Sequence, residues 1–231
     1  MHLLCAQMPE SGLPARALIF DFDGLILDTE SSIYEAWSAA FVAHGAGELT
    51  IEEWAAEIGT QRGLDLETML HTRASGPVDI AAMHVARQRH RDDLLEREIT
   101  RPGVEAWIDE AERAAVPVAI ASSSEYEWVD GHLRRLGLRD RFEVLSCFDG
   151  TCPAKPAPDL YLNACASLGI EPARALAVED SPNGVRAAKA AGMKVVAVPN
   201  PITAQLDLSE ADVQLASLAD CSIRDALART S

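Results

Sequence analysis

The 231-residue sequence is poor in lysine and in aromatic residues, and it has no long apolar run. It contains three lysines, and acidic residues outnumber basic residues 36 to 20, which gives a net charge of −16. A charge of this sign repels phosphate backbones and anionic lipids, so we expect neither nucleic acid nor a membrane as a partner. The longest apolar stretch, residues 114–121, is far shorter than the ~20 residues that a membrane-spanning helix needs.

Signals for disulfides, zinc and export are also lacking. The five cysteines include no CxxC pair and have no histidine nearby that would complete a zinc site. Free thiols in a reducing compartment explain such a set best. The first residues carry neither a basic region nor an apolar core long enough for a signal peptide, so we expect a cytoplasmic protein. Nothing in the sequence indicates an obligate dimer, and a monomer is expected.

Short apolar runs alternate with helical patterns along most of the chain. Runs with so little polar alternation are typical of strands buried on both faces of a parallel sheet. The expected strands are 17–22, 117–121, 143–146, 175–178, 194–198 and 213–215. Helices are expected at 124–136, 158–168 and 182–191, and each is followed by a glycine suited to a left-handed helix end, at 137, 169 and 192. The alternation predicts an α/β fold with a doubly wound, Rossmann-like parallel sheet.

One long interval, residues 30–99, contains helical patterns and no convincing strand. Thr50 and Glu53 have the spacing of a capping box, and further helices are expected at 64–71 and 78–97. Some 70 residues are far too many for a βα connection, whose loops run to roughly 2–6 residues. We therefore predict an all-helical domain at 30–99, inserted into an α/β core domain made of 1–29 and 100–231.

Polar and charged side chains follow the expected strands, where ligands bind in open parallel sheets. Asp21 and Asp23 follow the first strand, and Ser122 and Ser123 follow the second, close to the start of a helix whose N–H groups favour an anion. The remaining candidates are Lys155, Glu179 and Asp180. We expect all of them to meet at one edge of the sheet.

These residue types suit phosphoryl transfer. Of two carboxylates at positions i and i+2 of a strand end, one can attack phosphorus while the other donates and then removes a proton. Four acids packed together need a cation among them, and an all-oxygen ligand set suits Mg²⁺. The chemistry expected is metal-assisted phosphoryl transfer through an aspartyl-phosphate.

Four segments resemble the motifs of the haloacid dehalogenase-like hydrolases, in the order and spacing of that family: DFDGLILDTE, ASSS, KPAPDLY and VEDSPNG. The resemblance runs from about residue 18 to 202 and is to the subgroup with a helical cap after the first motif. That subgroup includes β-phosphoglucomutases and many small-metabolite phosphatases.

The resemblance implies a role for each candidate residue. Asp21 would be the nucleophile and Asp23 the general acid/base, while Ser122, Ser123 and Lys155 would hold the phosphoryl group. Gly24 would let the backbone turn tightly beneath it. The implied Mg²⁺ ligands are Asp21, Asp23 through its backbone carbonyl, and Asp180, with Glu179 in support. In the cap, Arg62 and Gln61 are candidate contacts to the substrate.

Three features narrow the activities that the family offers. A second acid at Asp23 fits phosphate esters and not haloacids, and residues 30–99 contain no lysine for the Schiff base of a phosphonoacetaldehyde hydrolase. The mutase pattern has a histidine four residues after Thr29, where this chain has Ile33. We therefore expect a phosphatase of small phosphorylated metabolites, sugar phosphates above all.

Two alternatives stay open from the sequence, a β-phosphoglucomutase-type mutase and an inactive relative that serves as a binding module. The four tryptophans, at 37, 54, 107 and 128, have helical spacings and are interpreted as core residues.

Overall fold

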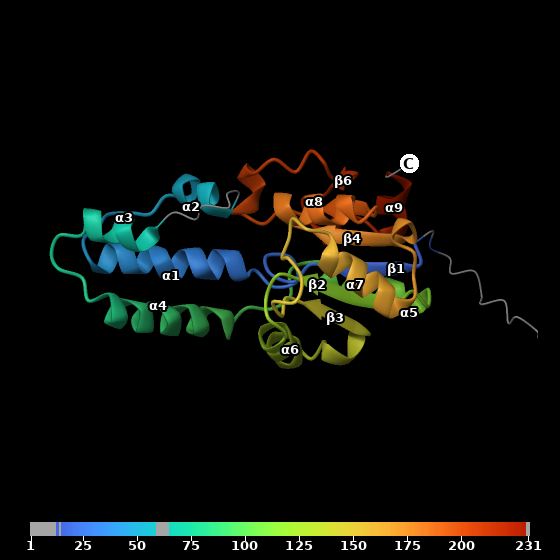
Figure 1. Cartoon of the computed structure of the whole chain (residues 1–231), viewed down its shortest axis with the longest axis horizontal. Coiled ribbons are helices and arrows are strands. Elements are labelled where there is room, and N and C mark those ends of the chain that lie inside the picture. Colours follow the sequence, from blue (N-terminus) through green and yellow to red (C-terminus); the bar gives the residue numbers. More distant parts are fainter. Residues whose placement is uncertain (1–12, 14, 59–64, 230–231) are drawn as a thin grey trace, which may run out of the picture.

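The computed structural model describes residues 13, 15–58 and 65–229, and it places six parallel strands in one sheet (Figure 1). The strand order is β3-β2-β1-β4-β5-β6, with every neighbouring pair parallel. The strands are β1 (Ala17–Phe20), β2 (Val118–Ser122), β3 (Val144–Cys147), β4 (Ala175–Glu179), β5 (Lys194–Ala197) and β6 (Val213–Gln214). This confirms the predicted α/β fold with a parallel sheet.

The strand order reverses at β1, which pairs with β2 on one side and β4 on the other. Leu18 lies opposite Val118 of β2 and Leu176 of β4, so the three strands run in step. Loops leaving β1 and β4 therefore go to opposite faces and leave a crevice between them, where ligands bind in sheets of this topology.

Alternate residues of the strands point to two separate cores. Leu18 and Phe20 of β1 belong to one core, and Ala17 and Ile19 belong to the other. The first core is covered by α5 (Val104–Arg113), α6 (Tyr126–Arg135) and α9 (Ile223–Ala228), and the second by α7 (Asp159–Leu168) and α8 (Pro182–Ala190). Burial on both faces explains why the strand sequences show so little polar alternation.

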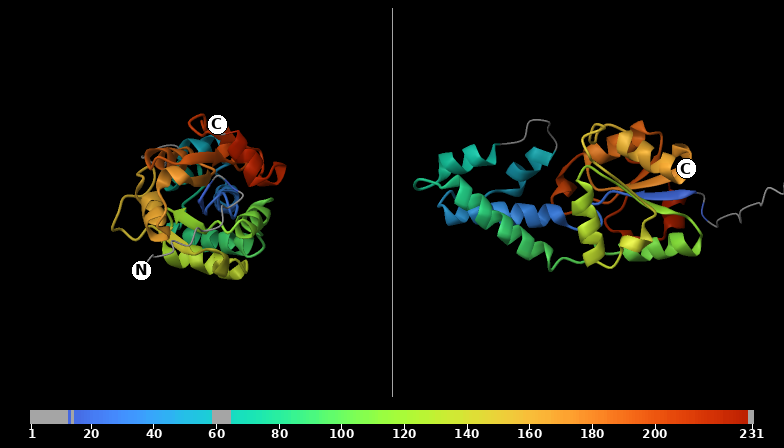
Figure 2. Two further views of the ribbon diagram at one scale, coloured as in Figure 1. Left: turned by 90° about the vertical axis from the view of Figure 1, so that its right-hand side faces the viewer. Right: turned by 60° about the horizontal axis from the view of Figure 1, so that its bottom comes forward.

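Four helices project beyond the carboxyl ends of the strands (Figures 1 and 2). They are α1 (Thr29–Ala43), α2 (Ile51–Ile58), α3 (Leu66–Arg73) and α4 (Ile80–Leu95). Helices α1 and α4 lie side by side, and residues such as Trp37, Phe41, Leu70 and Met83 form a third apolar core among the four helices. None of the described helices is long and apolar enough to span a membrane.

Local signals in the sequence are confirmed where the structure describes them. Thr50 and Glu53 form the expected capping box, with reciprocal bonds of 3.0 and 3.1 Å. The glycines at 137, 169 and 192 all have φ between 66° and 85°. One placement was wrong: Ser122 is the last residue of β2, and α6 begins four residues later, at Tyr126. Helices α5 and α9 have no counterpart among the sequence-based predictions.

Candidate active site

Asp21 and Asp23 follow β1 directly, at the edge of the sheet from which α1–α4 project. The backbone N–H of Asp21 donates to Val178 O at 2.9 Å, which extends the pairing of β1 with β4 by one residue. Gly24 then turns the chain in the left-handed region, with φ +76°, and a Cβ at this position would lie 2.4 Å from Asp180 Oδ2. Both the conformation and the close approach require glycine, and together they keep the two aspartates at the sheet edge.

Lys155 connects the ends of β1 and β4. Its Nζ lies 2.5 Å from Asp21 Oδ1 and 2.6 Å from Glu179 Oε1, and its side chain is 5% exposed. Glu179 is fully buried, and its Oε1 also accepts a 2.7 Å hydrogen bond from Tyr161 of α7. Its Oε2 accepts from the backbone N–H of Asp180 at 3.1 Å. Glu179 is therefore fixed by its neighbours and in turn fixes the lysine.

Asp180 is held from the side of β5. Asn200 Nδ2 donates to Asp180 Oδ2 at 2.7 Å and to Gly24 O at 3.3 Å. The guanidinium of Arg101 bonds Gly24 O at 2.6 Å and Pro199 O at 2.8 Å. These contacts tie the loop after β1 to the loop after β5, with Asp180 between them.

Asp23 receives its hydrogen bonds from the segment that follows β2. Ser124 Oγ donates to Asp23 Oδ2 at 2.7 Å, and Ser122 Oγ lies 3.5 Å from the same oxygen. Trp128, on α6, donates its indole N–H to Asp23 Oδ1 at 2.9 Å. Asp21 and Asp23 are thus two residues apart in sequence but have separate sets of partners, as a division of labour between them requires.

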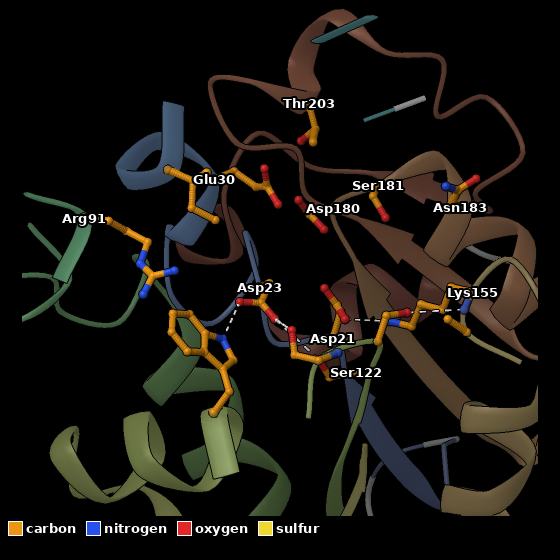
Figure 3. A pocket seen from close by; sticks show the side chains of 15 residues that line it. Asp21, Asp23, Glu30, Arg91, Ser122, Lys155, Asp180, Ser181, Asn183 and Thr203 are labelled. Carbon is orange, nitrogen blue, oxygen red and sulfur yellow. Dashed lines mark hydrogen bonds and ion pairs between the residues drawn. The ribbon is translucent and has the colours of Figure 1, made fainter. Parts of the chain in front are cut away.

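Both aspartates line a cavity of about 450 Å³ between the sheet edge and the helices α1 and α4 (Figure 3). Glu30 and Ile33 of α1 and Arg91 of α4 face it from the helical side. The predicted site residues that line it are Asp21, Asp23, Ser122, Ser123, Lys155 and Asp180. The site therefore has a wall of charged groups on the sheet and a more mixed wall on the helices.

Acidic groups outnumber cations at the base of this cavity. Burial, together with nearby Glu179, raises the pKa of Asp21 to about 8 although Lys155 partly offsets the effect. Burial and the carboxylates of Asp21 and Glu179 raise the pKa of Asp180 well above its ordinary value. At least one oxygen from each of Asp21, Glu179 and Asp180 lies within 4.8 Å of the others. A bound cation would relieve this repulsion and let all three carboxylates ionise.

The structure brings together all the predicted site residues that it describes. Glu179 contacts Lys155, Gly24 lies against Asp180, and Ser123 Oγ accepts a 3.3 Å hydrogen bond from the backbone N–H of Lys155. Gln61 and Arg62 lie outside the described residues.

Several residues of the site were not among the candidates named from the sequence, and three of them are instructive. Asn200 carries a detectable signal, because it is a polar residue a few positions beyond an expected strand. Glu30 lies in the first motif and faces the cavity, and burial, with Asp23 and Asp28 nearby, raises its pKa to about 7. Trp128 packs against the first core, as expected, but it is only partly buried and also lines the cavity and bonds Asp23, whereas Trp37, Trp54 and Trp107 are buried in the cores.

Comparison with known proteins decides the family. The sequence profile of the haloacid dehalogenase-like hydrolases matches residues 18–198, more than three quarters of the chain. The chain belongs to this family. The family recognised from the sequence is thereby confirmed, and the matched residues include the strand ends described above.

Relatives within the haloacid dehalogenase-like family cover nearly the full chain. The YhcW protein of Bacillus subtilis is 42% identical over 90% of this chain and 94% of its own length. Hexitol phosphatase B of Escherichia coli K12 is 33% identical over 91% of this chain and 96% of its own. The crystal structure of CbbY from Rhodobacter sphaeroides, solved in complex with phosphate, superposes with a TM-score of 0.69 at 31% identity and covers 89% of this chain and 96% of that one.

Proposed function

We propose that the protein is a Mg²⁺-dependent phosphatase that hydrolyses small phosphorylated metabolites, with sugar phosphates as the main class, through an aspartyl-phosphate at Asp21. The observation that carries this proposal is the pair Asp21 and Asp23, which line one cavity yet have separate partners. A relative that is 33% identical bears the name hexitol phosphatase, which supports a small phosphate ester as substrate.

The reaction assigned to this pair has two steps. Asp21 attacks phosphorus as the ester P–O bond breaks, and Asp23 gives its proton to the departing alcohol oxygen. Water then attacks the aspartyl-phosphate, Asp23 takes a proton from it, and the P–O bond to Asp21 breaks to release phosphate. Both aspartates return to their starting states, so the cycle balances.

The anionic phosphoryl group would be held by groups of both strand ends. Lys155 provides a buried ammonium beside Asp21, and the hydroxyls of Ser122 and Ser123 line the same cavity. Gly24 has no side chain and so lets the Asp180 carboxylate approach the turn after Asp23. Charged donors placed where negative charge develops are the main source of catalysis in phosphoryl transfer.

The buried carboxylates fit a divalent cation. Three acids against one lysine leave an excess of negative charge in a buried, all-oxygen set, which suits Mg²⁺. Asp21, Asp180 and the backbone carbonyl of Asp23 would hold the ion, which supplies charge neutralisation for the phosphate. Glu179 is engaged by Lys155, Tyr161 and backbone N–H groups, and so we assign it a supporting role.

We also propose that residues 30–99, with helices α1–α4, act as a cap domain over the core formed by 1–29 and 100–231. A cavity walled by Glu30, Ile33 and Arg91 on one side suits a small substrate whose leaving group contacts these helices. Closure of such a cap excludes bulk water and completes the contacts to the substrate. Gln61 and Arg62, between α2 and α3 in the sequence, are proposed as further cap contacts.

A mutase is the second candidate. It would hand the phosphoryl group to a sugar hydroxyl in place of water. Ile33 lines the cavity at the position where the mutase pattern has a histidine, and its hydrocarbon side chain cannot exchange a proton with Asp23. This observation favours water as the acceptor.

The test is phosphate release from a panel of sugar, polyol and aryl phosphates, with Mg²⁺ and after its removal by chelation. We expect Mg²⁺-dependent release that the conservative variant Asp21→Asn loses by at least about 10³-fold, because the amide is a poor nucleophile. Conversion of glucose 1-phosphate to glucose 6-phosphate much faster than phosphate release would establish the mutase instead. Full activity in Asp21→Asn would contradict the mechanism, and inactivity towards every ester would favour the binding module.

A further inference from the structure

Among the described residues, the carboxylate of Asp23 takes its hydrogen bonds from one short segment of the α/β part of the molecule. Ser122, Ser124 and Trp128 span the end of β2 and the first turn of α6. Helix α1 contributes Glu30 and the apolar Ile33 to the cavity, and among the described residues none of α1 donates a hydrogen bond to the Asp23 carboxylate. The orientation of the Asp23 carboxylate therefore depends on the β2–α6 segment.

The three donors differ in what they can do. A serine hydroxyl both donates and accepts, so Ser122 and Ser124 can rotate to accept when Asp23 Oδ2 carries a proton. The indole N–H of Trp128 is a donor only, and it bonds Oδ1 at 2.9 Å. The indole N–H therefore needs Oδ1 as an acceptor without a proton, whether Asp23 is protonated or ionised. The proton that Asp23 transfers is consequently carried on Oδ2.

The indole is itself held in place from two sides. His132, one turn further along α6, packs against the ring edge-on at a centroid distance of 4.4 Å. The guanidinium of Arg91, on α4, lies over the ring at 5.4 Å from its centroid, a cation–π contact. Because Arg91 belongs to the proposed cap, the position of α4 bears on the group that orients Asp23.

We propose that Trp128 is a positioning residue that holds the Asp23 carboxylate for proton transfer, and that Arg91 connects this function to α4. The inference rests on the proposed function, since it takes Asp23 as the acid/base. Trp128 would do this from the core domain, so that no histidine from α1 is required.

The test compares two kinds of ester in the variant Trp128→Phe, which keeps an aromatic ring and removes the N–H. Proton donation matters most for a poor leaving group, so we use glucose 6-phosphate and p-nitrophenyl phosphate, whose leaving group departs without help. If general acid catalysis contributes roughly 10²–10⁴-fold, misplacing the acid should lower kcat/KM for glucose 6-phosphate at least tenfold, because kcat/KM includes only the steps up to cleavage of the ester. The kcat/KM for p-nitrophenyl phosphate should change less than threefold, and the later hydrolysis of the aspartyl-phosphate does not enter this comparison.

The matched control is Trp107→Phe. Trp107 also donates its indole N–H, to the backbone carbonyls of Leu218 and Cys221 at 2.9 Å, but it is buried in the core beneath the sheet. This variant should lose some stability and keep the wild-type ratio of the two rates. Destabilisation of the fold would lower both rates together. The ratio of the rates therefore distinguishes a role of Trp128 in orienting Asp23 from a role in stabilising the protein.

A second readout does not depend on turnover. In a protein with ¹⁵N-labelled indoles, Asp23→Asn should shift the N–H resonance of Trp128 and leave that of Trp107 in place. Suppose that the wild type is active and that Asp23→Asn abolishes turnover of glucose 6-phosphate. An unchanged ratio of the two rates in Trp128→Phe, or an unmoved Trp128 resonance in Asp23→Asn, then contradicts the role of Trp128 and leaves the proposed function intact. A wild type that hydrolyses neither ester contradicts the proposed function, and the inference with it.

Discussion

Glu179 occupies a space that exists because residue 184 is a glycine. Gly184 lies in the first turn of α8, and a Cβ there would stand 1.8 Å from Glu179 Oε1 and 1.9 Å from its Cδ. Since Glu179 bonds both Lys155 and Tyr161, its position determines where the buried ammonium lies. A single missing methyl group thus supports the charge arrangement at Asp21.

Gly184→Ala should disrupt this arrangement. The methyl group cannot be accommodated unless Glu179 moves, and overpacking of this kind costs about 1–3 kcal/mol. We expect a lower free energy of unfolding in urea and a loss of phosphate release greater than the loss of folded protein, because Lys155 moves with Glu179.

The control for this change is Gly131→Ala. Gly131 is an exposed residue within α6, and a Cβ there meets no atom within 4 Å. Alanine is favoured over glycine in a helix by up to about 1 kcal/mol, so this variant should be as stable as the wild type or more so, and active. Wild-type stability and activity in Gly184→Ala would show that the glycine is not required.

At the scale of elements, β6 is the least extensive strand, with two residues, and one carboxylate attaches its start to the sheet. Asp212 Oδ2 accepts from Val195 N–H at 2.8 Å and from Lys189 Nζ at 2.9 Å, while Lys194 Nζ lies 3.4 Å from Oδ1. These bonds join β6 to β5 and α8. The edge of the sheet is therefore stabilised by charge as well as by backbone pairing.

The contribution of Asp212 should depend on pH in a defined direction. Partial burial opposes ionisation, but the bonds from Lys189 and Val195 prevail and lower the pKa of Asp212. A lowered pKa in the folded state adds stability above the unfolded-state pKa of about 4, and this stability disappears as the pH falls through the folded value. Asp212→Asn should therefore cost about 1 kcal/mol at pH 7, after allowance for the exposure of the lysines.

Urea unfolding of wild type and variant at pH 7, 5 and 3 measures this difference. It should be constant between pH 7 and 5 and shrink at pH 3. Asp93→Asn, on the exposed surface of α4, removes the same charge and should change stability little at any of these values. A difference that grows towards low pH would contradict the assigned role of Asp212.

The sequence predicts the elements of the sheet better than the helices that cover it. Strands buried on both faces leave apolar runs, and helix ends leave caps and glycines, so both kinds of element are visible locally. Helix α5 also has a periodic pattern, with Val104, Trp107, Ile108 and Ala111 all buried, but it begins directly after Gly103 and has no capping side chain to mark its start. The helix becomes recognisable only when the buried positions are followed over its full length.

At the scale of the whole molecule, the candidate site follows from topology. Once β1 is placed between β2 and β4, residues 21, 122 and 180 must meet, because the ends of neighbouring parallel strands adjoin. What the sequence cannot provide is the pairing of side chains across that edge. Trp128 and Asn200 reach Asp23 and Asp180 through rotamers and helix orientation, and these are set by packing in three dimensions.

The net charge of −16 explains why a cation is needed close to the bound phosphate group. A strongly acidic protein repels a phosphate ester at long range, so attraction must come from charges close to the bound anion. Lys155 is one of three lysines in the chain, and it is placed against Asp21 at the base of the cavity. The attraction for the phosphate group therefore lies at Lys155, directly beside Asp21.

The most direct measurement of the chemistry at Asp21 is chemical trapping of the phosphorylated residue. Asp23→Asn, which slows both proton transfers, is mixed with p-nitrophenyl phosphate and Mg²⁺, quenched, and reduced with borohydride, which converts an acyl phosphate of aspartate to homoserine. Peptide mass spectrometry should find homoserine at position 21 and at no other aspartate, and none without substrate. Rapid release of p-nitrophenol with aspartate intact at position 21, or homoserine at another position, would contradict the account.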